Sequence, residues 1–447
     1  MSSSSVARGA AFRSIRRRRG RAPHNEKVAG FGTSFRALQS RNYRLFFAGQ
    51  TTSLIGTWMT RLATSWLVYR LTGSAVLLGT VSFCGQVPMF FLAPIAGVWV
   101  DRWDRRRTLV LTQVLSALQS LALAALTLLG VIRIWHIVAL ALAQGIINAI
   151  DMPARQSFVI QMVERREDLP NAIALNSSMV NASRLIGPAL AGVVIGAIGE
   201  GWCFLLDGVS YLAVIASLLA MTIRPTAARG PARRALDELA EGWRYVRESR
   251  PIRSLLLLLS LVSLVGMPYS VLMPIFAGRI LHGGAHTLGF LMGASGVGAL
   301  AAALLLAGRK TVRGLGKRIA IATAVFGGAL IAFGLSKSLW LSLGVLPLVG
   351  YGMMQQMAGT NTILQTIVED DKRGRVMAYY AMAFQGVAPF GALLAGGVTD
   401  WIGAPATVAW GGVVCVLAAG WFAWRLPLLR EAVRPIYARL GILPELT

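Results

Sequence analysis

Five ionisable side chains fall inside long apolar stretches of this sequence: Arg61, Asp151, Arg155, Arg184 and Asp207. A charge in such a stretch is costly and usually faces an internal aqueous space or pairs with another charge. Guanidinium groups bind oxyanions, and a carboxylate can bind and release a proton. These residue types therefore favour anion binding and proton exchange as the chemistry of the chain.

The two isolated arginines differ in depth. Arg184 lies about 13 residues into its apolar segment, which is about 20 Å along a helix and near the middle of a bilayer. Arg61 lies in the outer half of the first segment. We expect both to face a substrate. The alternatives are a buried pair or, for Arg61, a side chain that extends to the membrane surface.

The two acids have simpler interpretations. Asp151 and Arg155 are four residues apart, so a local salt bridge on one helix face is expected, with gating or proton carriage by Asp151 as alternatives. Asp207 lies about one turn inside the outer end of its segment. We expect an interfacial acid there, and proton coupling is the alternative.

Metal and covalent chemistry are not indicated. The three cysteines stand singly in apolar segments, and His282 and His286 lie in a glycine-rich loop without further ligands. No nucleotide-binding GxxxxGK[ST] motif occurs, so a built-in ATP motor is not expected. We expect no metal, no cofactor and no enzyme activity, because no histidines or carboxylates cluster at one depth.

The elements that carry these residues must be membrane helices. The chain is 55% hydrophobic and only 14% charged, too apolar for a soluble protein of 447 residues. A spanning helix needs about 20 apolar residues. Twelve segments qualify, and a polar stretch divides them six and six: 45–71, 75–100, 108–131, 134–157, 171–198 and 202–223, then 252–280, 287–307, 318–335, 339–361, 374–399 and 404–424.

The net charge of +25 follows the expected loops and does not indicate a nucleic-acid binder. If the N-terminus is cytoplasmic, only four of the 44 Lys and Arg residues lie in the outer loops: Arg70, Arg133, Arg279 and Lys337. This is the positive-inside pattern, and it predicts both termini in the cytoplasm beside anionic lipid headgroups. We interpret the basic N-terminal tail as a disordered cytoplasmic arm, with an organellar transit peptide as the alternative.

One charged hinge and one repeated pattern indicate two halves that move. The hinge GVWVDRWDRRRTL (97–109) joins two apolar segments, and its arginines would hold it at the cytoplasmic surface. Residues 151–199 and 360–403 share a glutamine, a short charged loop and a helix with a central proline, at equivalent positions of the two halves. Parallel halves of this kind are typical of secondary transporters.

The hinge resembles the loop signature of the major facilitator superfamily, with Asp104 where a glycine is usual. NYRLFFAGQTTSLIGTWM, NAIDMPARQSF and RLIGPALAG are similar to its transmembrane secretion effector branch, which includes enterobactin exporters and macrolide efflux proteins. The resemblance implies that Asp101 meets the N-terminus of the segment at 374–399 and holds the cytoplasmic side shut, with loop anchoring alone as the alternative. The gating residues that it implies are Gly97, Asp101, Arg102, Arg105, Asp151 and Arg155.

Further residues complete the expected site. GPALAG resembles the core of an antiporter motif, although plain helix packing by Gly187, Pro188 and Gly192 explains it equally well. Polar, aromatic and methionine side chains suit a cavity for bulky ligands, with helix packing as the alternative. The expected cavity residues are Gln50, Trp58, Arg61, Gln144, Asn148, Arg184, Tyr269, Met273, Met353, Gln356 and Asn361.

We therefore expect an all-α membrane protein of 12 transmembrane helices in two pseudo-symmetric six-helix halves, with both termini cytoplasmic. It would lie as a monomer in a bacterial inner membrane and export a bulky amphiphilic small molecule, siderophore-like or drug-like, by proton antiport. Macrolide or multidrug efflux, uptake by symport, and a non-transporting receptor or scaffold are the alternatives. The expected parts are a tail (1–44), two halves (45–223 and 252–425), a linker (224–251) and a C-terminal tail (426–447).

Overall fold

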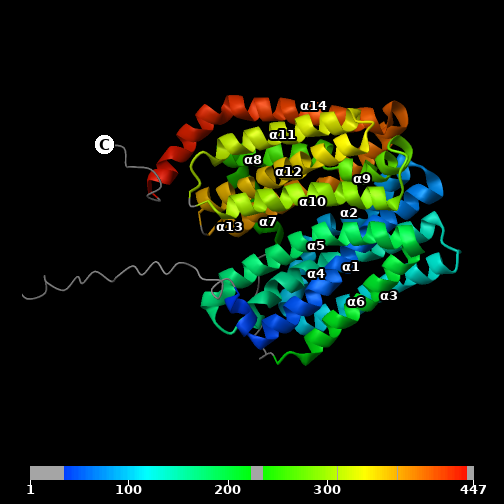
Figure 1. Cartoon of the computed structure of the whole chain (residues 1–447). Coiled ribbons are helices and arrows are strands. Elements are labelled where there is room, and N and C mark those ends of the chain that lie inside the picture. The colour runs from blue at the N-terminus through cyan, green and yellow to red at the C-terminus, as the bar shows by residue number, and fades with distance from the viewer. Residues whose placement is uncertain (1–34, 223–234, 310, 370, 440–447) are drawn as a thin grey trace, which may run out of the picture.

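The computed structural model describes residues 35–222, 235–309, 311–369 and 371–439, and these form helices and short connections without a strand. The first six long helices make one bundle, coloured blue to green in Figure 1. They are α1 (Arg41–Thr72), α2 (Ala75–Arg102), α3 (Arg105–Leu128), α4 (Ile134–Met162), α5 (Leu169–Ile198) and α6 (Glu200–Ala220).

The remaining helices form a second bundle beside the first (Figure 1). A short amphipathic helix, α7 (Ala235–Glu248), precedes it. Two of its long helices contain π-helical turns. The elements are α8 (Arg250–Leu261), η4 (Val262–Gly266), α9 (Tyr269–Ile275), η5 (Phe276–Ile280), α10 (Ala285–Ala307), α11 (Leu315–Leu335), α12 (Leu339–Ile367), α13 (Arg373–Ala381), η6 (Met382–Gly386) and α14 (Ala388–Arg439).

Gly403 divides α14 into two helices. Its φ of 82° lies in the left-handed region, which glycine adopts without a steric penalty. Pro405 follows and has no backbone N–H for a continuous helix. The second part continues to Arg439, so the first residues of the expected C-terminal tail are helical; the last eight lie outside the described residues.

Nine helical stretches among the described residues are long and apolar enough to cross a bilayer. Residues 373–438 count as one of them although Gly403 interrupts the helix. α1 and α12 are not among the nine, because polar side chains such as Arg61 and Gln356 dilute their apolar residues. The structure thus confirms an all-helical membrane fold, and the count of twelve spans remains a prediction.

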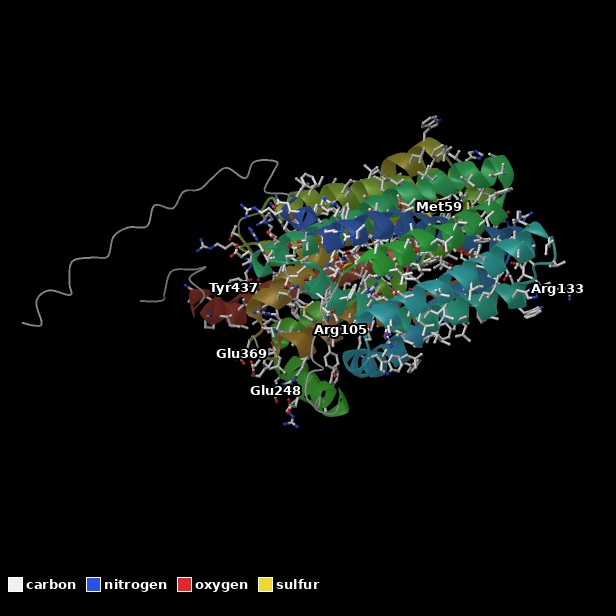
Figure 2. The ribbon with its side chains drawn as sticks, turned by 90° about the horizontal axis from the view of Figure 1, so that it is seen from below. Met59, Arg105, Arg133, Glu248, Glu369 and Tyr437 are labelled. Atoms are coloured by element: carbon white, nitrogen blue, oxygen red, sulfur yellow. The ribbon has the colours of Figure 1, made fainter. Side chains whose placement is uncertain are left out.

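The two bundles meet through glycines, which allow backbones to approach closely. A Cβ on Gly79 of α2 would lie 2.5 Å from the Ala392 carbonyl oxygen of α14. Gly192 of α5 faces Gly289 of α10 in the same manner. Figure 2 shows Glu369 and Arg133 at opposite ends of the molecule, and we name the two ends after these residues.

Two π-helical turns lie against each other in the second bundle. The Ser263 hydroxyl of η4 donates a hydrogen bond of 2.5 Å to the Phe384 carbonyl oxygen of η6. A π-turn leaves backbone carbonyls free, and Pro268 and Pro389, which follow the two turns, remove further donors. The contact joins the first helix of the second bundle to the helix that ends at Gly403, at a place where both are locally irregular.

Candidate substrate site at the interface of the two bundles

Arg61, Arg184 and Trp58 form a cluster inside the molecule. The Arg61 guanidinium carbon lies 4.8 Å from the centre of the Trp58 ring, and that of Arg184 lies 5.8 Å from the same ring. A cation over an aromatic face is stabilised by about 0.5–2 kcal/mol. The tryptophan of α1 therefore holds the two arginines, one from its own helix and one from α5, around a single centre.

The GPALAG stretch makes room for this cluster. A Cβ on Gly187 would lie 2.5 Å from the Cβ of Trp58, closer than side chains tolerate, so only glycine permits Trp58 at this position. One turn further on, Gly192 lies against Gly289, whose added Cβ would be 2.8 Å from the Pro188 carbonyl oxygen. The motif packs α5 on α1 at one place and on α10 at the next, which supports its packing interpretation.

The cluster extends into the second bundle. Nη2 of Arg184 donates to the Met353 sulfur of α12 at 3.7 Å. The charge of Arg184 also acts on the Tyr269 hydroxyl, which shares a hydrogen bond of 2.8 Å with Ser295. Arg184 of α5 therefore contacts α1 of the first bundle and α12 of the second, and lies near Tyr269 of α9.

The charge of the cluster is uncompensated. The two guanidinium groups are close enough to repel one another. Within the ranges that the structure describes, no carboxylate forms an ion pair with either arginine. Arg61 is exposed by its surface area although its neighbours belong to the bundle interior, and Trp58 and Arg184 are half-buried. The two guanidinium groups thus offer charged hydrogen-bond donors that an anion could accept from.

Other expected cavity residues are enclosed in this conformation. Gln50, Met273 and Gln356 are 3% exposed or less. The Gln356 amide nitrogen is buried without a hydrogen-bond partner in the structure. Asn361, further along α12, is half-buried and accepts a 2.6 Å hydrogen bond from the Gln365 amide. The three buried side chains are thus closed off from water in this conformation.

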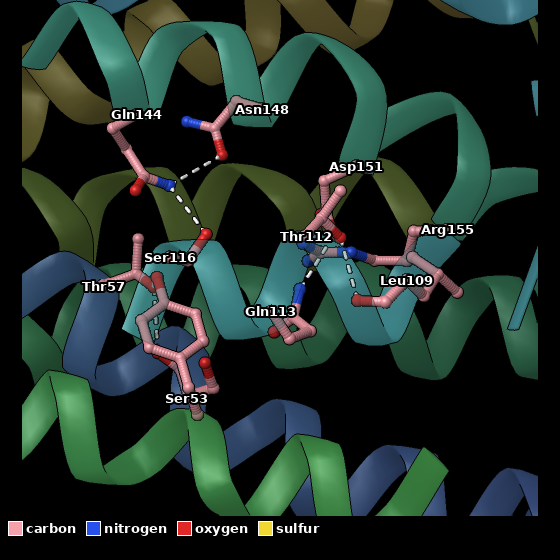
Figure 3. A network of polar contacts seen from close by, with 11 residues as sticks. Ser53, Thr57, Leu109, Thr112, Gln113, Ser116, Gln144, Asn148, Asp151 and Arg155 are labelled. Carbon is pink, nitrogen blue, oxygen red and sulfur yellow. Dashed lines mark hydrogen bonds and ion pairs between the residues drawn. The ribbon is translucent and has the colours of Figure 1, made fainter. Parts of the chain in front are cut away.

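Gln144 and Asn148 belong to a polar network within the first bundle (Figure 3). The Gln144 amide donates to the Ser116 hydroxyl at 3.3 Å and to the Asn148 side-chain oxygen at 3.2 Å. Both glutamine and asparagine are half-buried. The network joins α3 to α4, and it lies on the helix that also carries Asp151.

Asp151 is fully satisfied. It forms an ion pair with Arg155, and its other oxygen accepts hydrogen bonds of 2.8 Å from Thr112 and Gln113 of α3 (Figure 3). The residue is 3% exposed. Its partner in the structure is thus the arginine four residues on, as the spacing predicts. Thr112 and Gln113 were not anticipated, because the sequence does not show which face of α3 meets α4.

The charged hinge begins α3. Gly97, Asp101 and Arg102 lie in the last turns of α2, and their side chains lie outside the described part of the chain. Asp104 is the N-cap of α3, because its carboxylate accepts a 2.9 Å hydrogen bond from the Arg107 backbone N–H. Asparagine and aspartate are favoured at such caps, and this signal is readable from the sequence.

Arg105 and Arg106 occupy the first turn of α3 and have different surroundings. Arg106 donates to the Leu218 and Leu219 carbonyl oxygens at the end of α6, at 2.8 and 2.6 Å. It thereby satisfies two carbonyls that a helix terminus leaves without a partner. Arg105 is half-buried. Sequence reasoning anticipated that the arginines anchor this loop, but not that Arg106 closes the end of another helix.

Comparison with known proteins assigns the chain to a family. The model of the transmembrane secretion effector family matches residues 32–435. Solved structures of transporters share the fold. A POT family transporter in complex with 5-aminolevulinic acid has a TM-score of 0.68 at 11% identity, covering 87% of this chain and 97% of that one. A mutant of the nucleoside transporter NupG has a TM-score of 0.67 at 12% identity, covering 86% and 98%.

Curated relatives match along most of the chain. The Staphyloferrin A transporter of Staphylococcus aureus is 26% identical over 384 residues, 85% of this chain and 95% of the relative. The multidrug efflux pump Tap of Mycolicibacterium fortuitum is 29% identical over 404 residues, 87% and 96%. Macrolide efflux protein A of Streptococcus pyogenes is 26% identical over 251 residues, 54% and 61%.

The chain therefore belongs to the transmembrane secretion effector family, within the major facilitator superfamily. It is a multi-pass membrane transporter and not an enzyme. The resemblance that the sequence motifs indicated is confirmed.

Proposed function

We propose that this protein is a secondary active exporter of a bulky, anionic or oxygen-rich amphiphile of the siderophore class, driven by proton antiport. The observation that carries the proposal is the pair of unpaired guanidinium groups around Trp58. In a site of low dielectric constant, two cations strongly disfavour a third cation and favour carboxylate or catecholate oxygens. Asp151 does not reverse this field, because Arg155 already neutralises it.

Transport would proceed by alternating access of two six-helix halves, about 45–223 and 252–425, joined by the linker 224–251. Twelve spans result when α1 and α12 are counted and α14 is divided at Gly403. The positive-inside pattern supports a cytoplasmic location for both termini and hence for the Glu369 end. Arg184 supports the mechanism because it contacts both halves, so a ligand bound to it would respond to their relative motion.

Macrolide or multidrug efflux is the second candidate. The names of two relatives, a multidrug efflux pump and a macrolide efflux protein, favour it. The contact of Arg184 with the Met353 sulfur favours it as well, because flexible methionines adapt to ligands of varied shape. The two candidates differ in the charge of the ligand, which can be tested.

The test compares efflux of three probes from bacterial cells that produce wild-type protein or Arg184→Gln: an iron-free catecholate siderophore, a macrolide and ethidium. A charge-assisted contact contributes about 1.5–3 kcal/mol, so we expect siderophore efflux at limiting concentration to fall about tenfold or more. Ethidium efflux should be absent in the wild type. In Arg184→Gln it should be absent or increase, because the variant lacks a charge that repels the cation.

Arg425→Gln is the matched control. The Arg425 guanidinium carbon lies 5.0 Å from the centre of the Trp421 ring, so Arg425 forms the same type of cation–π contact, but in the second bundle. It should leave efflux of all three probes unchanged. The proposed substrate class is wrong if the wild type exports the macrolide and ethidium but not the siderophore, and if Arg184→Gln leaves the efflux of all three probes unchanged.

A further inference from the structure

Asp207 of α6 is enclosed by three helices. Asp207 is 2% exposed, and α6 packs against α1 and α3. One oxygen, Oδ2, accepts a 3.1 Å hydrogen bond from Ser120 of α3. The other, Oδ1, points at α1, where a Cβ on Gly56 would lie only 2.7 Å from it. Asp207 is therefore more enclosed than the interfacial acid expected from its position in the sequence.

Two neighbouring polar atoms lack partners at this place. Oδ1 of Asp207 is buried without a hydrogen bond, and so is the hydroxyl of Thr60, one turn along α1 from Gly56. Thr60 faces the carboxyl group without reaching hydrogen-bonding geometry. Buried polar atoms are rarely left unsatisfied, so the pair requires an explanation. A proton on Oδ1 supplies one, because it neutralises the buried carboxylate, and a small movement would then let the O–H donate to the Thr60 oxygen.

The surroundings of Asp207 contain no compensating cation among the residues that the structure describes. α1 and α3 present Gly56, Thr60 and Ser120, and the titratable groups that feel its charge are Tyr211 and Cys203 of α6 itself. Among these described residues, none forms an ion pair with Asp207. The hydrogen bond from Ser120 is neutral and reaches only one oxygen, so it offsets only part of the cost of burying an ionised carboxylate, and such a group binds a proton instead.

Asp151 provides the contrast within the same bundle. It is buried to a similar degree, 3% exposed, but has an arginine and two neutral donors. Its ionised form is therefore stabilised where that of Asp207 is not. If one side-chain carboxyl group of this bundle exchanges protons during transport, the contacts favour Asp207 over Asp151.

We infer that Asp207 is a proton-binding site, occupied by a proton in this conformation, and that it is the proton-exchanging group of the transport cycle. α1 links it to the substrate site. Gly56 and Thr60 lie on the helix face toward α6, whereas Trp58 is about 200° around the helix from Gly56. Tyr211 bridges the two regions: its hydroxyl lies 3.4 Å from that of Thr57, and it acts electrostatically on Arg61.

If alternating access also shifts α1 relative to α6 within the first half, the carboxyl group becomes open to water and can lose its proton. The proton is then transferred from Oδ1 to water, and the carboxylate left behind is solvated. The same motion displaces Trp58 and Arg61, because they are on the same helix. This part of the inference rests on the proposed transport function; proton occupancy of Asp207 does not.

The first test is infrared spectroscopy of the purified full-length protein at neutral pH without substrate. A protonated carboxyl group gives a C=O stretch that a carboxylate lacks. This band should be present in the wild type and in Asp151→Asn and absent in Asp207→Asn. Thr60→Val, which removes the neighbouring hydroxyl, should keep the band. A band that survives in Asp207→Asn, or no such band in the wild type, overturns the inference.

The second test uses proteoliposomes and an iron-free catecholate siderophore. Asp207→Asn should retain counterflow and lose the acceleration produced by an imposed pH gradient. If the wild type shows counterflow and Asp207→Asn still responds to the gradient, the proton-exchange role of Asp207 is wrong and the transport function stands. If the wild type shows no counterflow, the proposed function is wrong, and the infrared band still decides whether Asp207 holds a proton.

Discussion

Gly187 of α5 lies directly against Trp58 of α1, so closely that an added Cβ would be 2.5 Å from the Trp58 Cβ and 2.9 Å from the Ile55 carbonyl oxygen. The same tryptophan holds both interior arginines. A residue that looks like a helix-packing glycine in the sequence thus determines where the cationic centre is placed.

Gly187→Ala should displace Trp58 and reduce siderophore efflux at least as much as Arg184→Gln does. Overpacking of a filled interior costs about 1–3 kcal/mol, so we also expect a lower unfolding temperature in detergent. Gly196→Ala is the matched control on the same helix, because a Cβ there meets open space. Normal efflux by Gly187→Ala with an unchanged unfolding temperature would contradict the proposed role.

Asp151→Asn should destabilise the first bundle, because it leaves the half-buried Arg155 without its anion. Breaking a buried pair costs about 3 kcal/mol, measurable as a drop in the thermal unfolding temperature. Adding Arg155→Gln should recover more than half of this loss. Equal destabilisation of Asp151→Asn and the double variant would show that the unpaired Arg155 charge is not the cause of the loss.

Asp101→Asn tests the gating role that the family resemblance implies. Loss of the charge should favour the state open to the cytoplasm and reduce transport while membrane insertion stays normal. Cysteines introduced at the two ends of the bundles, labelled with an impermeant reagent, report the change in accessibility. A stably inserted variant with normal transport would refute gating and leave anchoring of the loop as the role of the hinge.

Glu241→Arg should loosen α7 from the N-terminal end of α13. Glu241 forms a 2.8 Å ion pair with Arg375, and Trp243 of the same helix lies 5.9 Å from the Tyr379 ring. Both charged partners are partly exposed, so the pair contributes about 0–1 kcal/mol. Hydrogen exchange in 240–248 should increase modestly, and Arg375→Glu in the same chain should restore it. Unchanged hydrogen exchange in Glu241→Arg would show that this ion pair does not hold α7 against α13.

The sequence predicts the helical membrane fold well, because long apolar runs leave few alternatives. It also singles out Arg61 and Arg184, because a charge within such a run is rare. It does not predict that Trp58 lies between them, since that depends on how α1 and α5 rotate about their axes. Packing at Gly187 determines this rotation, and no local pattern reveals it.

Asp207 illustrates the same limit. Distance along the segment suggests an acid near the membrane surface, yet contacts with Gly56 and Ser120 enclose it. Asp104 is the opposite case. It departs from the family signature, but its role as the cap of α3 follows from the known preference for aspartate at that position.

Transport by purified protein in proteoliposomes tests the central claim most directly. The measurement is counterflow of the iron-free catecholate siderophore, the macrolide and ethidium, with and without an imposed proton gradient. We expect counterflow of the siderophore without a gradient, acceleration by the gradient, and no counterflow of ethidium. Absence of counterflow above protein-free liposomes for every probe would contradict secondary transport of this substrate class and favour a receptor or scaffold.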